Sequence, residues 1–175
     1  MKKILIVVVL LMNLLATQAK AQCSDTHFLC KKQFSKEDKK GGWNINQQSH
    51  SESVEKGQVY ELTLSAYQGL EYRLSVCTDI DGGTSATFQL AHDVMITVTD
   101  SSGNTSIERQ RKVIFDNTTD ATELHILFRS NKTEKFYLSI NVPTAGKSKN
   151  SKLKDTDNVC VGVLLEHRKT KSSAL

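Results

Sequence analysis

Histidines and cysteines are the residues of this 175-residue chain best suited to do chemistry. The five histidines are scattered, and none of them pairs with another at the spacing of helical metal ligands. His92 and Asp93 are adjacent, but neighbouring residues of a strand point to opposite faces, which argues against a catalytic dyad. The hydrolase motifs G-x-S-x-G and H-E-x-x-H are both absent. We therefore predict that the chain is not an enzyme.

An acidic, glycine-containing loop is the candidate cation site. Asp79, Ile80 and Asp81 precede Gly82 and Gly83, and carboxylate and carbonyl oxygens on such a turn are the ligands that calcium prefers. Asp79 and Asp81 are the candidate calcium ligands, and the sequence otherwise predicts no cofactor. A plain turn that needs no ion remains the alternative.

Two aromatic residues could form a binding surface. Trp43 and Tyr67 fall in predicted loops or strand ends, where aromatic rings can stack on sugars in a carbohydrate-binding module. The alternative for Trp43 is that its indole closes one end of the fold, because indoles are mostly buried. Tyr60 and Tyr72 fall on apolar strand faces, and we assign them to the core.

The four cysteines, Cys23, Cys30, Cys77 and Cys160, predict two disulfides in an exported protein. Cys77 and Cys160 are out of phase with the apolar residues around them, so both should lie on a non-core strand face. The preferred pairing is Cys77 with Cys160 and Cys23 with Cys30. An N-terminal segment tied across the fold by both of its cysteines is the alternative, and both cross pairings remain open.

Export is predicted by the first 21 residues. Lys2 and Lys3 precede an apolar run, and Ala19-Lys20-Ala21 has the pattern of a signal-peptide cleavage site. Of the 23 basic residues, Lys2, Lys3 and Lys20 lie in this leader, which leaves 20 against 19 acidic residues. A nearly neutral exported chain gives no reason to expect a nucleic-acid partner. We predict a single domain over 22–168, a disordered tail over 169–175, no membrane insertion after cleavage, and a secreted or periplasmic location.

Alternating apolar residues dominate the rest of the chain. Val59–Leu64 and Leu70–Val76 read as two strands with one buried face each, and Ser65–Gly69 reads as the loop of a β-hairpin. Further short runs of the same period follow, separated by turn residues, and none has the period of a helix. The pattern predicts an all-β fold, an antiparallel β-sandwich or jelly roll of about eight or nine strands.

The segment Val54–Leu62, VEKGQVYEL, followed by strand–turn–strand, resembles the opening of bacterial pre-peptidase C-terminal-type jelly-roll domains. Tyr72–Cys77 and Val159–Val163 also resemble segments of small secreted bacterial proteins of unassigned function. The complete β-sandwich and the absence of a catalytic constellation predict a non-catalytic binding or interaction module at the bacterial cell surface or in the periplasm, with a protein or glycan partner. The alternatives are a carbohydrate-binding module and a small secreted hydrolase or inhibitor.

Overall fold

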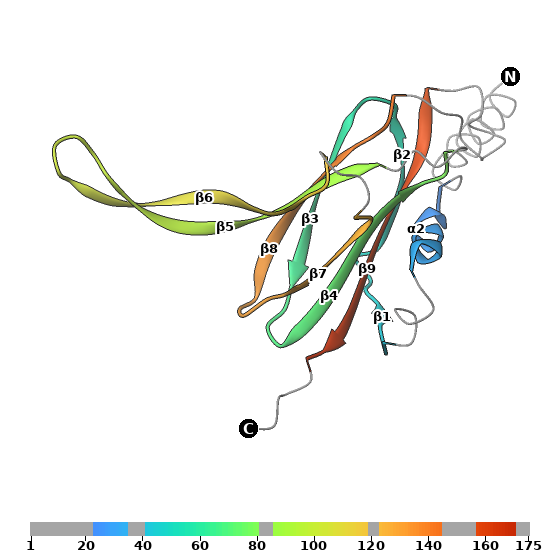
Figure 1. The fold of residues 1–175 in the computed structure, drawn as a ribbon, viewed down its shortest axis with the longest axis horizontal. Coiled ribbons are helices and arrows are strands. Elements are labelled where there is room, and N and C mark those ends of the chain that lie inside the picture. Colours follow the sequence, from blue (N-terminus) through green and yellow to red (C-terminus); the bar gives the residue numbers. More distant parts are fainter. Residues whose placement is uncertain (1–22, 35–40, 81–85, 119–122, 145–156, 171–175) are drawn as a thin grey trace, which may run out of the picture.

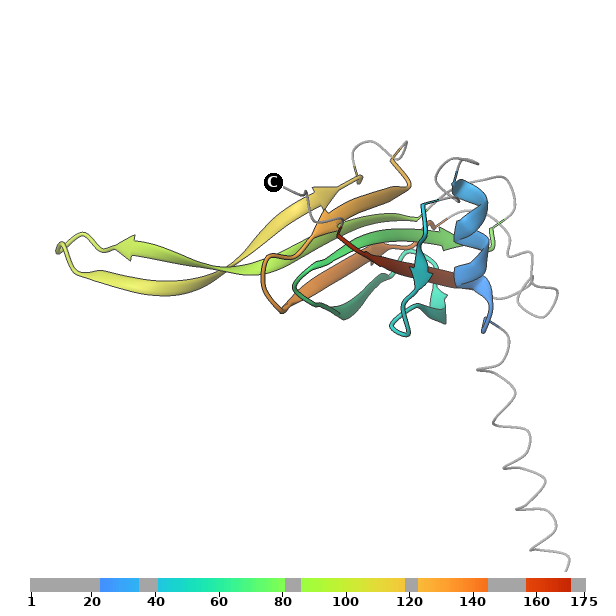
Figure 2. The same cartoon turned by 90° about the horizontal axis from the view of Figure 1, so that it is seen from below.

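The computed structural model describes residues 23–34, 41–80, 86–118, 123–144 and 157–170. Two antiparallel sheets pack face to face in this part of the chain, which confirms the predicted all-β sandwich (Figures 1 and 2). A single helical turn, α2 (Thr26–Leu29), continues into a 3-10 turn, η2 (Cys30–Gln33). The strands are β1 (Asn44–Ile45), β2 (His50–Glu55), β3 (Val59–Ala66), β4 (Leu70–Thr78), β5 (Thr87–Thr99), β6 (Thr105–Asp116), β7 (His125–Arg129), β8 (Glu134–Asn141) and β9 (Asn158–Lys169).

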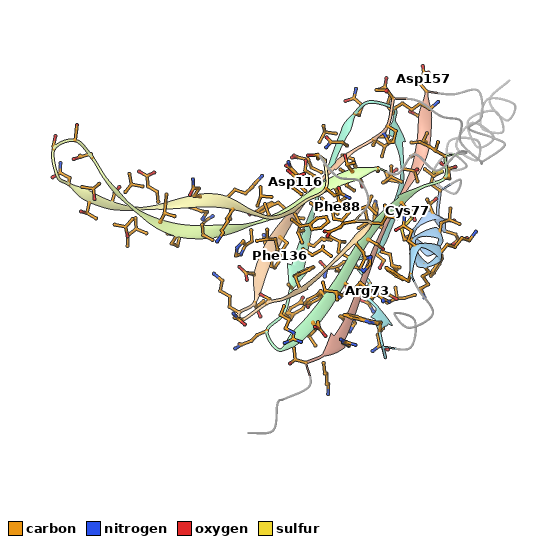
Figure 3. All side chains as sticks on the ribbon, in the orientation of Figure 1. Arg73, Cys77, Phe88, Asp116, Phe136 and Asp157 are labelled. Carbon is orange, nitrogen blue, oxygen red and sulfur yellow. A yellow bond between two sulfur atoms is a disulfide. The ribbon has the colours of Figure 1, made fainter. Side chains whose placement is uncertain are left out.

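The final strand, β9, organises the larger sheet. It pairs with β1 and β2 along one edge and with β4 along the other, and β4 pairs in turn with β7. The smaller sheet has the order β3-β8-β5-β6. Alternate side chains of both sheets meet between the layers, where Phe88 and Phe136 lie (Figure 3). Burial of this face accounts for the period of two that runs through the sequence.

The predicted hairpin over Val59–Val76 is wrong in its pairing, although both strands exist. β3 pairs with β8 in one sheet and β4 pairs with β9 in the other, so the chain crosses from one layer to the other between them. The Tyr72 hydroxyl accepts a hydrogen bond from the Tyr67 amide at 2.8 Å and steadies this crossing. Alternation shows which face of a strand is buried. It does not distinguish strands that pair with each other from strands that face each other across the core, because both show the same pattern.

Residues 87–99 form one strand that runs through His92 and Asp93. Phe88, Leu90, Val94, Ile96 and Val98 all keep the same phase, so the strand continues without a break. Pairing of β5 with β8 stops at His92, which lies opposite Phe136, whereas pairing with β6 continues to Thr99. The two strands therefore leave the sandwich together as a long ribbon, the yellow-green extension of Figure 1. We call residues 93–112 the arm.

Two disulfides are present, as predicted, but the preferred pairing is wrong. Cys23 bonds to Cys160 and Cys30 bonds to Cys77, so the N-terminal segment is tied across the sheet by both of its cysteines. Cys77 and Cys160 do lie on the non-core face of β4 and β9. They stand two positions apart in register, because Cys77 lies opposite Gly162. The turns α2 and η2 cover this face, with Cys23 just before α2 and Cys30 at the start of η2 (Figures 2 and 3). We call residues 23–34 the strap.

A buried ion pair lies next to the strap on the outer face of the larger sheet. Arg73 of β4 donates from Nε to Glu166 Oε2 at 2.9 Å, and both side chains are almost fully buried. The Phe34 ring lies 3.8 Å from the Arg73 guanidinium carbon, and the Trp43 ring packs between Arg73 and Arg168. Aromatic faces and the carboxylate replace the water that the guanidinium loses on burial.

Candidate binding surface on the four-stranded sheet and its arm

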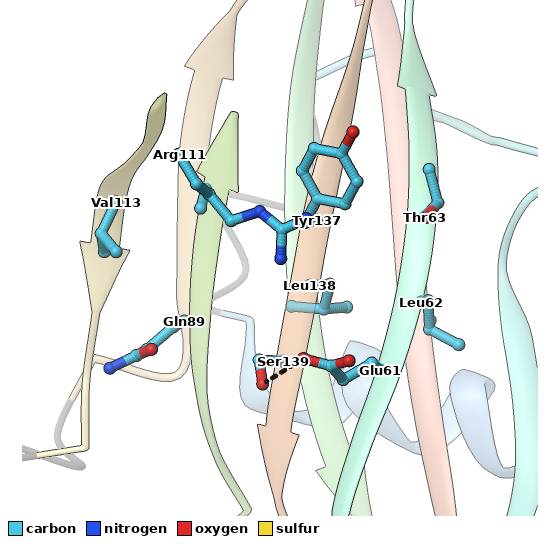
Figure 4. A pocket seen from close by; sticks show the side chains of 10 residues that line it. Glu61, Leu62, Thr63, Gln89, Arg111, Val113, Tyr137, Leu138 and Ser139 are labelled. Carbon is cyan, nitrogen blue, oxygen red and sulfur yellow. Dashed lines mark hydrogen bonds between the residues drawn. The ribbon is translucent and has the colours of Figure 1, made fainter. Parts of the chain in front are cut away.

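A hollow of about 260 Å³ lies on the outer face of the four-stranded sheet, where the arm leaves the sandwich (Figure 4). All four strands contribute to it, because odd-numbered residues of β3, β8 and β5 share this face with odd-numbered residues of β6 up to Val113. Its lining is mostly polar: Glu61, Leu62, Thr63, Gln89, Ala91, Arg111, Val113, Tyr137, Leu138 and Ser139.

Tyr137 of β8 lies at the centre of the hollow. The Arg111 guanidinium carbon stands 3.9 Å from the centre of its ring, and the Tyr137 hydroxyl donates to Asp93 Oδ2 at 3.0 Å. Asp93 also lies 3.9 Å from the Arg109 guanidinium. These contacts join both strands of the arm to the sheet and fix the direction in which the arm leaves it.

Short polar links hold the remaining side chains of the hollow. Ser139 donates to Glu61 Oε1 at 3.5 Å (Figure 4). Gln89 donates to Asp116 Oδ2 at 2.7 Å. Hydrogen bonds from the Thr118 hydroxyl and amide hold the pKa of the Asp116 carboxyl below its ordinary value. The floor of the hollow is therefore a preorganised polar surface.

The tip of the arm is a tight and well-satisfied turn. The Gly103 amide donates to the Asp100 carbonyl, and Gly103 has a φ of +85°, which suits the glycine of a three-residue hairpin loop. The Asp100 carboxylate accepts from the Asn104 side chain at 3.0 Å and from the amides of Ser102 and Asn104. These hydrogen bonds, with that of the Asn104 side chain the strongest, lower the pKa of Asp100. The tip therefore keeps its shape without support from the sandwich.

The arm exposes apolar side chains on both of its faces. Met95 and Ile107 lie on the same face as the hollow and are 65% and 70% exposed. Val94, Ile96 and Val98 lie on the opposite face, which continues the core face of β5 beyond the core, and they are half-buried. The hollow and the arm face with Met95 and Ile107 form one continuous surface, which we call the arm surface.

The two aromatic residues proposed for ligand binding do not come together. Trp43 is half-buried against Arg73 and Arg168 on the outer face of the larger sheet. Tyr67 is 52% exposed at the crossing from β3 to β4, where it lines a separate hollow with Ile45, Leu70 and His167. Neither belongs to the arm surface, and a glycan role for either remains a prediction.

Asp79 has a structural contact that the sequence did not suggest. Its carboxylate accepts a hydrogen bond from the Cys160 amide at 2.9 Å, and its own amide donates to the Cys160 carbonyl at 3.1 Å. Asp81 lies outside the described residues. Within the described ranges, no group of three or more His, Cys, Asp or Glu side chains is arranged to hold a metal ion. The calcium site at Asp79 and Asp81 remains a prediction.

Sequence reasoning did not identify the arm surface, although two signals for it were present. Apolar residues keep the same alternation from Phe88 to Val98, which indicates a single strand much longer than the usual length of about five or six residues. In the run from Ile107 to Lys112, IERQRK, every residue after the isoleucine is polar or charged. That stretch therefore has no apolar side chains to match the alternating ones of the strand beside it. A long strand that pairs with a polar strand is a signature of a ribbon outside the core.

Comparison with solved structures gave weak likenesses, two of which are described here. No family model matches the chain, and no curated protein sequence matches it. Aeromonas hydrophila PliG, a periplasmic inhibitor of g-type lysozyme, has a TM-score of 0.38 at 11% identity over 77% of this chain and 91% of its own. The CBM22-1–GH10 modules of Clostridium thermocellum xylanase 10B, complexed with xylohexaose, have a TM-score of 0.26 at 14% identity over 77% of this chain and 27% of theirs. At these values no function is transferred from either protein.

Proposed function

We propose that the chain is an exported, non-catalytic binding module that holds a protein partner on its arm surface. Export is supported by the two disulfides, which form and persist in oxidising compartments. In the described part of the chain, no helix is long and apolar enough to cross a membrane.

The observation that carries the proposal is the exposure of Met95 and Ile107 on a two-stranded ribbon outside the sandwich. A two-stranded ribbon by itself is marginally stable in water. Large aliphatic side chains gathered on such a ribbon gain most when a partner buries them. Polar groups of the hollow lie directly beside them, and this combination of an apolar centre and a polar border is typical of protein interfaces.

A protein partner fits this surface better than a glycan does. The arm contains no Phe, Tyr or Trp, so it offers no flat ring for a sugar to stack on. The Tyr137 ring in the hollow already carries the Arg111 guanidinium on one face. Aliphatic side chains next to paired charges suit a protein surface.

A polar cluster near the base of the arm contains a serine, a histidine and a carboxylate, the residue types of a hydrolase triad, but they are not arranged in the order that catalysis needs. His92 Nδ1 lies 3.0 Å from Glu134 Oε2, and the Ser130 hydroxyl donates to Glu134 Oε1 at 2.8 Å. A nucleophilic serine needs the imidazole beside its hydroxyl so that the base can take the proton. Here the carboxylate lies between them, which supports a structural role for the cluster.

Site-specific photo-cross-linking tests the proposal. A photoreactive residue at Ile107 should capture one discrete protein in the native compartment, whereas the same residue at Leu127 should not. Leu127 is 53% exposed on β7 of the other sheet and is therefore a matched control. With the captured protein purified, Ile107→Asp should weaken binding at least tenfold, and Leu127→Asp should leave it unchanged. Equal capture from both positions, or capture of nothing but a second copy of the chain, would overturn the proposal.

A further inference from the structure

Among the strands that the structure describes, none pairs with the outer edge of the arm. β6 ends the order β3-β8-β5-β6, and residues 105–114 are all exposed. The Asn104 carbonyl accepts a hydrogen bond from the Asp100 amide at 3.0 Å, so Asn104 and every second residue after it turn their backbone groups toward β5. Thr105, Ile107, Arg109, Arg111 and Val113 therefore direct their backbone groups away from β5. Such an edge is a template for a further strand.

We propose that this edge pairs with the same edge of a second copy of the chain, antiparallel, about a two-fold axis at Gln110. An interface between identical strands must be self-complementary about its axis. An axis at Gln110 places Glu108 opposite Lys112 of the second copy and repeats that opposite-charge pair on the other side. It also places Ile107 opposite Val113, and both of these apolar side chains are exposed in the single chain.

Other registers lose this match. Moving the axis to Arg109 sets Glu108 opposite Gln110 and Ile107 opposite Arg111. Moving the axis to Arg111 sets Glu108 opposite Ile114 and brings two copies of Arg111 together. Paired opposite charges and paired aliphatic side chains each stabilise neighbouring strands, so the axis at Gln110 is preferred.

At this axis Arg109 of each copy lies opposite Arg111 of the other, and contacts within each chain hold these like charges away from each other. Arg111 is directed over the Tyr137 ring of its own chain, and Arg109 lies beside Asp93. Both guanidinium groups are therefore drawn away from the strand edge where the two copies meet.

Pairing of the two edges also stabilises the arm, which by itself is a lone two-stranded ribbon. Two arms joined side by side form a four-stranded sheet in the order β5-β6-β6-β5, and three or more strands are needed for a sheet to be stable in water. The contact covers the edges and sets Ile107 beside Val113 of the second copy, but it leaves Met95 of β5 accessible on the face of each arm. The inference is thus separate from the proposed protein partner.

Cysteine cross-linking of the otherwise unchanged protein tests the register. In a non-hydrogen-bonded antiparallel pair, facing Cα atoms are about 4.5 Å apart, within reach of a disulfide. Gln110→Cys should therefore form a covalent dimer on mild oxidation. Ser106→Cys is the control, because it is an exposed position on the same face of β6 that would lie opposite Ile114. Equal dimer from both variants, or none from Gln110→Cys, would overturn the register.

Charge reversal tests the dimer without an added cysteine. In analytical ultracentrifugation, Glu108→Lys and Lys112→Glu should each weaken self-association by about tenfold, and the double variant should restore it. A native chain that stays monomeric at concentrations on the order of 100 µM would contradict the proposal. A native chain that stays monomeric and still captures a protein partner from Ile107 would refute this inference and leave the proposed function standing.

Discussion

Gly162 of β9 lies directly beneath the backbone of His27 in the strap. A Cβ atom at position 162 would stand 2.5 Å from the His27 amide nitrogen and 2.6 Å from the Thr26 carbonyl carbon. Backbone atoms of a segment held by two disulfides have little freedom to move aside. Glycine at 162 is therefore the condition for the strap to lie flat on the sheet.

We expect Gly162→Ala to lower the free energy of unfolding by about 2 kcal/mol, because overpacking against a fixed backbone forces the strap to shift. Denaturant unfolding measures this change. Ser75→Ala is the control on the same face, since the buried Ser75 hydroxyl has no hydrogen-bond partner among the described residues and its removal should cost little. Equal effects of the two substitutions would argue against a close fit at Gly162.

The disulfide pairing can be read from peptides of the unreduced protein. Cleavage before Asp25 separates Cys23 from Cys30. We then expect one linked pair with Cys23 and Cys160 and another with Cys30 and Cys77. Recovery of a peptide that links Cys77 to Cys160 would contradict the structure. The chain-entropy argument gives about 4 kcal/mol for the shorter bridge, so Cys30→Ser with Cys77→Ser should lower the melting temperature markedly.

Acid stability should depend on Glu71. Burial raises the pKa of the Glu71 carboxyl, but hydrogen bonds from Arg168 and Arg129 outweigh burial and leave the pKa below the ordinary value of 4.5. A lowered folded-state pKa means that Glu71 stabilises the fold above pH 4.5 and that this stabilisation is lost as the pH falls through the lower value. Glu71→Gln should therefore flatten the fall in unfolding free energy below pH 4.5. An unchanged slope would show that Glu71 contributes nothing to it.

Trp43 and Tyr67 should differ in their effect on stability. Trp43→Ala removes a ring that covers two guanidinium groups and should cost about 1–3 kcal/mol, whereas the exposed Tyr67 ring should contribute no more than about 0.5 kcal/mol. Thermal melts of both variants check this. A glycan array run with the same proteins checks the sugar hypothesis, which would gain support if wild type bound a glycan and Tyr67→Ala, with a native melting curve, did not.

The predicted calcium site has an equally direct test. Saturating calcium raises the melting temperature of a protein that binds it only when folded. Asp81→Asn should abolish the rise if the site exists, and it leaves the hydrogen bond between Asp79 and Cys160 in place. A wild-type melting curve that neither calcium nor EDTA moves would leave Asp79 with its structural role alone.

The fold class was predictable because a strand with one buried face has alternating apolar and polar residues in its sequence. Phe136, Leu138, Ile140 and Val142 were assigned to a core face by their alternation, and all four are buried. Pairing partners were not predictable in the same way. β3 and β4 were taken for a hairpin because a five-residue loop permits either pairing or a crossing between layers, and alternation is the same for both.

The arm surface and the strap escaped prediction for related reasons. Val94, Ile96 and Val98 alternate like core residues, and nothing in the alternation shows that the pairing of β5 with β8 ends at His92. The helix α2 has only four residues, too few to show a helical period. Correct placement of Cys77 and Cys160 on the outer face could not reveal that a distant segment covers that face.

The central position of β9 has a consequence for how the chain acquires its structure. β1 and β2 pair with a strand more than 100 residues later in the sequence, and loops of that length make folding slow and late. Cys23 also meets its partner only in β9. The larger sheet and the Cys23–Cys160 bridge therefore cannot form before residues 158–169 are available. Their completion is the last step by which the chain acquires its structure.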